Sequence, residues 1–355
     1  MKAPTVTWLL GTMTSARKIA GYLVALAIAS AAPAAAQSPR PWLVPELLAA
    51  AKSEGSTLII YASMNEEEAL PYWAIFEQAT GIKVNFVRMS DSNIRARVAI
   101  EHRAGQRSWD LVATSPVYRL GNELLAPFDP PQAKDLIPQA RDPNRRWYGY
   151  SGNYNTPAYN TTKVTPEELP KSYEEFLERK QWAGKVAIDA TDTEWLSGLF
   201  VHYGEERGSK LVRDIVAALK PVVIDGHLNL GRQVGAGEYV VALNNYVPLT
   251  INLKLAGVPT DFWALDPVAL AFGSIGIYTQ APHPKTALLA ANYMLSHEGQ
   301  SFLTRKGRLP SRSDVTTNPP GVMDVLGQKK IIHTITSATE QRRMQQTFNE
   351  IFRPR

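Results

Sequence analysis

The chain has 355 residues, a formal net charge of +5 and no cysteine. This length exceeds what one ordinary hydrophobic core serves and indicates two domains, while the lack of cysteine excludes disulfides, thiolate metal sites and a lipid-modified N-terminal cysteine. The small net charge argues against a nucleic-acid-binding protein, which would show a clustered basic face.

The N-terminus has the pattern of a secretory signal peptide. Arg17 and Lys18 precede an apolar stretch over 19–33, and three alanines then precede Gln37. A basic region, an apolar region and small residues before a cleavage site are typical of exported proteins. We therefore expect a signal peptide over 1–36, cleavage near Ala36-Gln37 and a soluble protein in the periplasm. An uncleaved membrane anchor is the alternative, although the apolar run is shorter than a span requires.

Hydrophobic periodicity and turn residues predict strands and helices in alternation. In the first unit the predicted elements are a helix over 45–52, a strand over 56–62, a helix over 66–80, a strand over 83–89, a helix over 94–104 and a strand over 110–114. A polar connection over 126–150 leads to a segment near 149–155 that crosses to a second unit. That unit contains strands over 185–189, 221–224 and 238–243 and helices over 193–203 and 211–219. The chain returns through 261–272 and 275–278 and ends with helices over 285–295, 298–306 and 338–352. Such alternation predicts an α/β fold with a largely parallel sheet.

Several segments of this chain match a known family in the same order. They are 46–55, 61–63, 76–84 (FEQATGIKV), 159–161, 169–175, 184–189 and 291–300 (ANYMLSHEGQ). Together they resemble the ferric-iron-type extracellular solute-binding proteins of ABC importers, from about residue 46 to the C-terminus.

The resemblance implies a type II periplasmic-binding-protein fold. Two α/β lobes would be joined by crossing hinge strands, with lobe 1 over 37–150 plus 267–355 and lobe 2 over 151–266. A solute would be held in the cleft between the lobes by hinge closure, and the closed form would dock on a membrane permease.

Polar residues that follow the predicted strands are the candidates for this cleft, because α/β proteins bind ligands beyond the carboxyl ends of their strands and at helix N-termini. The candidates are Ser63, Asn65, Ser90, Ser92, Asn93, Thr114 and Ser115 in lobe 1, Asp192, Thr193, Trp195, Asn244, Asn245 and Tyr246 in lobe 2, and Tyr154 and Asp266 near the two crossings. For any one serine or threonine, simple helix capping is the favoured interpretation, and a capping role is compatible with a ligand role. Trp195, in the first turn of its helix, is expected to project into the cleft and stack on a solute; packing against a neighbouring element is the alternative.

The family resemblance also implies where ferric iron would bind. The iron-binding members use adjacent tyrosines after the strand that corresponds to 240–243, and this chain has Asn244-Asn245-Tyr246 there. One phenol remains beside two amides, which both donate and accept hydrogen bonds and suit an organic solute. We therefore expect no metal site, with Tyr246 as the ligand if iron is bound after all.

The sequence thus predicts the non-enzymatic, periplasmic substrate-binding component of an ABC importer. It would act as a monomer without a cofactor, capture a small polar organic solute, and have a membrane permease as partner; neither nucleic-acid binding nor membrane insertion is expected. Two alternatives stay open, a ferric-iron-binding periplasmic protein and a secreted hydrolase. The hydrolase has no G-x-S-x-G or H-E-x-x-H motif to support it.

Overall fold

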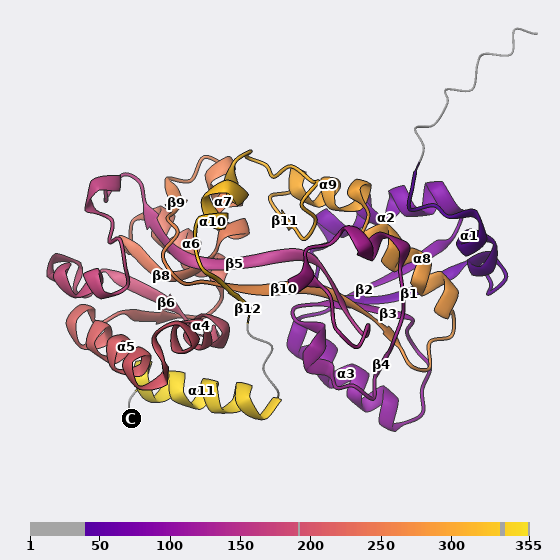
Figure 1. Ribbon diagram of the computed structural model, residues 1–355, viewed down its shortest axis with the longest axis horizontal. Helices are drawn as coiled ribbons and strands as arrows, with labels where there is room; N and C mark the ends of the chain where they lie inside the picture. Colours follow the sequence, from indigo (N-terminus) through magenta and orange to yellow (C-terminus); the bar gives the residue numbers. More distant parts are fainter. Residues whose placement is uncertain (1–39, 191, 334–337, 354–355) are drawn as a thin grey trace, which may run out of the picture. The chain divides into compact units, whose positions relative to one another are not determined.

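Helices and strands alternate in the computed structural model, which describes residues 40–190, 192–333 and 338–353 (Figure 1). The helices are α1 (Pro45–Lys52), α2 (Glu66–Thr80), α3 (Asp91–Arg103), α4 (Thr193–Tyr203), α5 (Glu205–Leu219), α6 (His227–Ala236), α7 (Val247–Leu255), α8 (Pro284–Met294), α9 (His297–Arg305), α10 (Val322–Gly327) and α11 (Ala338–Phe352). The strands are β1 (Thr57–Ala62), β2 (Lys83–Arg88), β3 (Leu111–Thr114), β4 (Leu125–Ala126), β5 (Tyr148–Asn160), β6 (Val186–Asp189), β7 (Val222–Ile224), β8 (Val241–Tyr246), β9 (Thr260–Phe262), β10 (Val268–Tyr278), β11 (Leu309–Pro310) and β12 (Ile331–His333). The predicted α/β fold is confirmed, whereas the predicted signal peptide lies outside the described residues.

The strands form one sheet in the order β2-β1-β3-β10-β5-β8-β6-β7. β1 is parallel to β2 and β3, and β6 is parallel to β7 and β8, as the alternating pattern predicted. The two central strands, β5 and β10, are buried along their whole length and are antiparallel to each other and to β8 and β3 beside them. The sheet is therefore mixed and not largely parallel as predicted, because each lobe keeps its own parallel strands and the crossing strands run against them. The sequence predicted two separate segments, 261–272 and 275–278, where β10 is a single strand. Gly273 lies at a shift in register against β5 and does not end the strand.

Two lobes flank the central strands (Figure 1). We call lobe 1 the part built on β1–β4 with α1–α3, α8 and α9, and lobe 2 the part built on β6–β9 with α4–α7 and α11. β5 and β10 run between the lobes and pair with strands of both, so they are the crossing strands that the fold requires.

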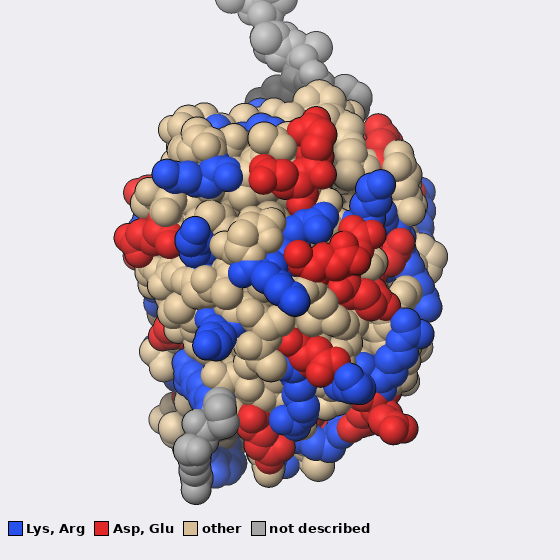
Figure 2. All heavy atoms as spheres, turned by 90° about the vertical axis from the view of Figure 1, so that its left-hand side faces the viewer, with Lys and Arg blue, Asp and Glu red and all other residues tan. Residues whose placement is uncertain are grey.

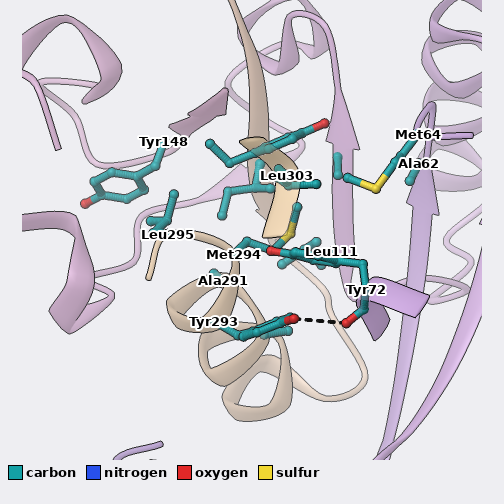
Figure 3. Packing of buried hydrophobic residues seen from close by; sticks show 14 of the residues in the cluster. Ala62, Met64, Tyr72, Leu111, Tyr148, Ala291, Tyr293, Met294, Leu295 and Leu303 are labelled. Carbon is teal, nitrogen blue, oxygen red and sulfur yellow. Dashed lines mark hydrogen bonds between the residues drawn. The ribbon is translucent and has the colours of Figure 1, made fainter. Parts of the chain in front are cut away.

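The core of lobe 1 packs aromatic and aliphatic side chains from α2, α8 and α9 against its strands (Figure 3). Tyr72 and Tyr293 meet with ring centroids 4.8 Å apart, and the Tyr293 hydroxyl donates to the Tyr72 carbonyl at 2.9 Å. The C-terminal helices α8 and α9 therefore complete the core of the N-terminal lobe, because the apolar faces of β1 and α2 need them as partners.

The core of lobe 2 includes the last helix of the chain. Met344, Phe348 and Ile351 of α11 are buried in the same cluster as residues of α4 and α5. This differs from the predicted lobe boundaries, which assign all of 267–355 to lobe 1. An amphipathic helix packs wherever its apolar face finds a partner, and its place in the chain does not decide which lobe that is.

Charges of both signs are interspersed on the face of the molecule in Figure 2, which looks at the left-hand side of Figure 1. Among the described residues, no helix has the length and apolar content needed to cross a membrane.

Candidate functional site

A cleft of about 500 Å³ lies between the two lobes. Its lining comes from the ends of β1, β2, β3 and β8, from the helices α2, α3 and α7, from the crossing strand β5, and from the segment after α9. The lining residues are Ser63, Asn65, Glu67, Glu68, Arg88, Ser90, Asp91, Ser115, Asn153, Tyr246, Pro248, Leu249, Asn252, Lys306 and Arg308. A volume of this size suits a small solute.

Three helix N-termini converge on this cleft. Asn65, Ser90 and Tyr246 are the residues that precede α2, α3 and α7, and all three line it. The Ser90 hydroxyl accepts a hydrogen bond from the backbone N–H of Asn93 at 3.3 Å, whereas no side chain of the described ranges caps α2 or α7. Helix N-termini carry partial positive charge and free N–H groups, so this arrangement favours an anionic group in the cleft.

Fixed charges reinforce this preference. Arg308 binds Glu68 through two hydrogen bonds of 2.9 and 2.8 Å, and Asp91 accepts from Thr114 and from the backbone N–H of Ser115. These two lining carboxylates are therefore already engaged. Arg88 and Lys306 form no ion pair with the described residues, and each presents a positive charge to the cleft.

Tyr246 rests on a buried polar cluster in lobe 2. Its ring stacks on the His227 ring, with centroids 3.9 Å apart and planes at 28°. His227 Nε2 lies 3.6 Å from an Asp189 oxygen and 3.7 Å from an Asp192 oxygen. Burial and the carboxylates of Asp192, Glu194 and Asp189 raise the pKa of Tyr246 well above its ordinary value. The phenol is therefore neutral and able to donate a hydrogen bond.

Five of the predicted site residues line the cleft: Ser63, Asn65, Ser90, Ser115 and Tyr246. Tyr246 is the last residue of β8, and the other four lie one to three residues after a strand, at the edge of the sheet that faces the cleft. Ser90 both caps α3 and lines the cleft, so the two interpretations of this serine are compatible.

Asn244 and Asn245 do not line the cleft, because β8 continues to Tyr246 instead of ending at residue 243. Both are buried within the strand. The Asn244 amide accepts from the backbone N–H of Asp189 at 2.8 Å and donates to Asp192 at 3.1 Å. Asn245 donates to the Thr250 hydroxyl at 3.1 Å. The two amides satisfy buried polar groups, which explains why a strand interior tolerates them.

Trp195 does not project into the cleft, which corrects the sequence-based expectation. Its ring is 1% exposed within the core of lobe 2, and its indole N–H donates to the Tyr173 hydroxyl at 2.9 Å. Asp192 is likewise buried, and caps α4 by accepting from the backbone N–H of Trp195 at 3.1 Å. Thr193, beside it, is buried as well, with its hydroxyl directed at Glu194.

The remaining candidates have structural contacts outside the cleft. Tyr154 is buried in the core of lobe 1, and Asp266 accepts from the backbone N–H of Lys330 at 2.6 Å. Ser92 and Asn93 lie in the first turn of α3, where Ser92 contacts the Ser90 hydroxyl at 3.1 Å. None of the four is among the lining residues.

Sequence reasoning missed the basic residues of the cleft. Arg88 is the last residue of β2, so the same strand-end rule could have found it. Lys306 and Arg308 follow α9, and Arg308 contacts Glu68, 240 residues earlier in the chain. No local sequence pattern predicts such a long-range contact. Across the described ranges, no cluster of three histidine or carboxylate side chains is arranged to hold a metal ion.

The fold and the cleft together define a two-lobe binding protein. Residues 118–332 match the family described as bacterial extracellular solute-binding protein. The chain belongs to this family, and it is the substrate-binding component of an ABC importer, a class that works with a membrane permease.

Two relatives are named as iron-binding or iron-uptake proteins. The chain is 30% identical over 273 residues to iron uptake protein A1 of Synechocystis, covering 71% of this chain and 74% of the relative. It is 24% identical to the Fe(3+)-binding periplasmic protein of Serratia marcescens, covering 72% and 78%.

Solved structures share the fold at lower identity. Iron-bound HitA from Pseudomonas aeruginosa matches with a TM-score of 0.69 and 21% identity, covering 82% of this chain and 99% of that one. AfuA from Actinobacillus pleuropneumoniae, solved with fructose-6-phosphate, matches with a TM-score of 0.69 and 18% identity, covering 84% and 99%. At these identities the match supports the fold alone.

Proposed function

We propose that this protein captures a small organic solute that carries an oxyanion, such as a phosphate, phosphonate or carboxylate. The observation that carries the proposal is the convergence of three helix N-termini with Arg88 and Lys306 on one cleft. Glu67, the third lining carboxylate, forms no ion pair with the described residues. It is exposed, as are Arg88 and Lys306, so salt screens the three charges alike and the two cations outnumber it.

The remaining lining groups suit the body of such a solute. Ser115, Asn153 and Asn252 offer hydroxyl and amide groups that both donate and accept, and the neutral Tyr246 phenol can donate. Closure of the two lobes about β5 and β10 would exclude water and strengthen these contacts. The protein would act as a monomer in the periplasm, with residues 1–36 as its cleaved signal peptide.

A melting-temperature screen of the purified protein from residue 37 onward tests the proposal. The probes are sugar phosphates, phosphonates, dicarboxylates, putrescine, thiamine and ferric citrate. A solute that binds the folded state stabilises it by mass action, by about 2.7 kcal/mol at 100 times its Kd. The melting temperature rises as a result. We expect at least one organic anion to do so, with an affinity that falls as salt rises.

Variants connect that affinity to the cleft. Arg88→Ala and Lys306→Ala should each weaken the anion about tenfold, a loss of about 1.4 kcal/mol, whereas Lys134→Ala, an exposed lysine of lobe 1, should have no effect. Stabilisation by putrescine or thiamine and by no anion would contradict the proposal.

Ferric iron is the second candidate, because both curated relatives above are named for iron. It would have Tyr246 as its one phenol in the cleft, with the Asn245 amide turned to Thr250. If ferric citrate alone stabilises the protein, and its phenolate-to-iron absorption disappears in Tyr246→Phe, iron is the solute.

A further inference from the structure

An ion pair joins the two lobes. Arg119 belongs to the 3₁₀ helix η1 (Val117–Leu120), which follows β3 in lobe 1, and Glu194 is the second residue of α4 in lobe 2. Arg119 Nη2 donates to Glu194 Oε1, and the two side chains are only 11% and 9% exposed.

Both partners stand on rigid supports. In lobe 1, the backbone N–H of Val117 donates to the Ser274 hydroxyl of β10 at 2.9 Å. In lobe 2, Asp192 caps α4 and accepts in turn from Asn155 of β5 and Asn244 of β8. The pair therefore connects one rigid part of each lobe. A rotation that opens the lobes would move the Arg119 guanidinium away from the Glu194 carboxylate.

A second contact between the lobes occurs at the wall of the cleft. Gly307 follows α9 of lobe 1, and Asn252 belongs to α7 of lobe 2. A Cβ atom built on Gly307 would lie only 1.8 Å from Asn252 Oδ1, so the two residues are in close contact. The structure thus has the lobes apposed at both places, which is the geometry expected of a closed cleft.

The energetics favour a reversible connection. Two opposite charges that are nine-tenths buried attract each other far more strongly than they would in water, but each also loses hydration. The Arg119 Nε group is buried and has no hydrogen-bond partner among the described residues, so part of that lost hydration is not replaced. Opening the lobes would return water to both charges and offset the lost attraction.

We propose that Arg119 and Glu194 form an interlobe latch that sets the fraction of closed molecules and, through it, the affinity for solute. This inference rests on the closure described under the proposed function. If only closed molecules hold solute firmly, the apparent Kd equals the intrinsic Kd divided by the closed fraction. Loss of the latch should then weaken binding even though neither residue lines the cleft.

The closed fraction can be measured by pulsed electron paramagnetic resonance between two spin labels. Since the chain has no cysteine, Arg103→Cys in lobe 1 and Arg213→Cys in lobe 2, both exposed, provide the only two labelling sites. We expect Glu194→Gln and Arg119→Met to add a longer interlobe distance to the distribution. Glu205→Gln, which removes an exposed ion pair with Arg343 within lobe 2, should leave it unchanged.

Affinity separates the latch from a direct charge effect. For an anionic probe such as a sugar phosphate, removing the negative Glu194 should tighten binding if charge alone mattered, whereas loss of the latch should weaken it about tenfold. Arg119→Met should weaken it in either case, so Glu194→Gln is decisive. An unchanged distance distribution in both folded variants, or tighter binding by Glu194→Gln, overturns the latch. If the distances lengthen and no anion binds to any form, the latch stands and the proposed function fails.

Discussion

Replacement of Trp195 distinguishes a role in the core of lobe 2 from a role in solute binding. The ring is 1% exposed and packs with Tyr173 and Phe352, at centroid distances of 5.9 and 6.5 Å. Truncation of a buried tryptophan to alanine costs roughly 3–5 kcal/mol. Trp195→Ala should therefore lose about that much free energy of unfolding and leave the solute affinity of the folded protein unchanged.

A milder change isolates the hydrogen bond. Trp195→Phe keeps most of the apolar contact but leaves the buried Tyr173 hydroxyl without the indole N–H, at a cost of roughly 1–3 kcal/mol. In the double variant with Tyr173→Phe the second substitution should cost less than it does alone, because the unsatisfied hydroxyl is gone.

Urea unfolding followed by circular dichroism measures these differences, and Val201→Ala supplies the control. Val201 lies on the same helix but is 61% exposed, so its truncation should change stability by no more than about 0.5 kcal/mol. A Trp195→Ala protein that keeps its stability and loses solute affinity would show that the indole contacts the solute, which contradicts a role in the core of lobe 2.

Two further substitutions test other parts of the structure. Gly307 and Gly257 both have positive φ, +78° and +82°, but a Cβ atom would clash with Asn252 only at Gly307. Both alanine variants should lose about 1–2 kcal/mol of stability to backbone strain. Gly307→Ala should lose at most about 0.5 kcal/mol more, because the exposed Asn252 side chain can turn away from the new methyl group. A much larger loss at Gly307 in urea unfolding would show that Asn252 is held in place. Burial lowers the pKa of His333 to about 4. As the pH falls, the unfolded chain therefore binds a proton at this histidine near about pH 6.5, whereas the folded protein binds it only near about pH 4. The free energy of unfolding should fall as the pH is lowered across that interval. In His333→Gln the fall between about pH 7 and about pH 4.5 should be smaller by about 1–3 kcal/mol. The same pH dependence in both proteins would show that His333 is not the cause.

Local patterns predicted the parts of the site that depend on local structure. Ser63, Asn65 and Ser90 come between a strand and the helix that follows it, and the strand-end rule finds them because parallel strands share one edge. The same rule reached Ser115 and Tyr246.

The failures have physical causes beyond local pattern. Trp195 lies in the first turn of α4, but that position alone does not determine whether the side chain points toward the cleft or toward the core of the lobe. Asn244 and Asn245 appeared to lie past a strand because amides are rare inside one, whereas buried donors and acceptors from β6 and α7 make them favourable there. Arg308 enters the cleft only through long-range packing, which no window of sequence contains.

The pairing of β5 with β10 has a consequence for how the molecule comes apart. Each of these strands is bonded to the other and to a strand of a different lobe. Unfolding of the core of either lobe would remove the pairing partners of a strand that also belongs to the core of the other lobe. Despite its two cores, the protein should show one calorimetric transition, with hydrogen exchange slowest along this shared pair.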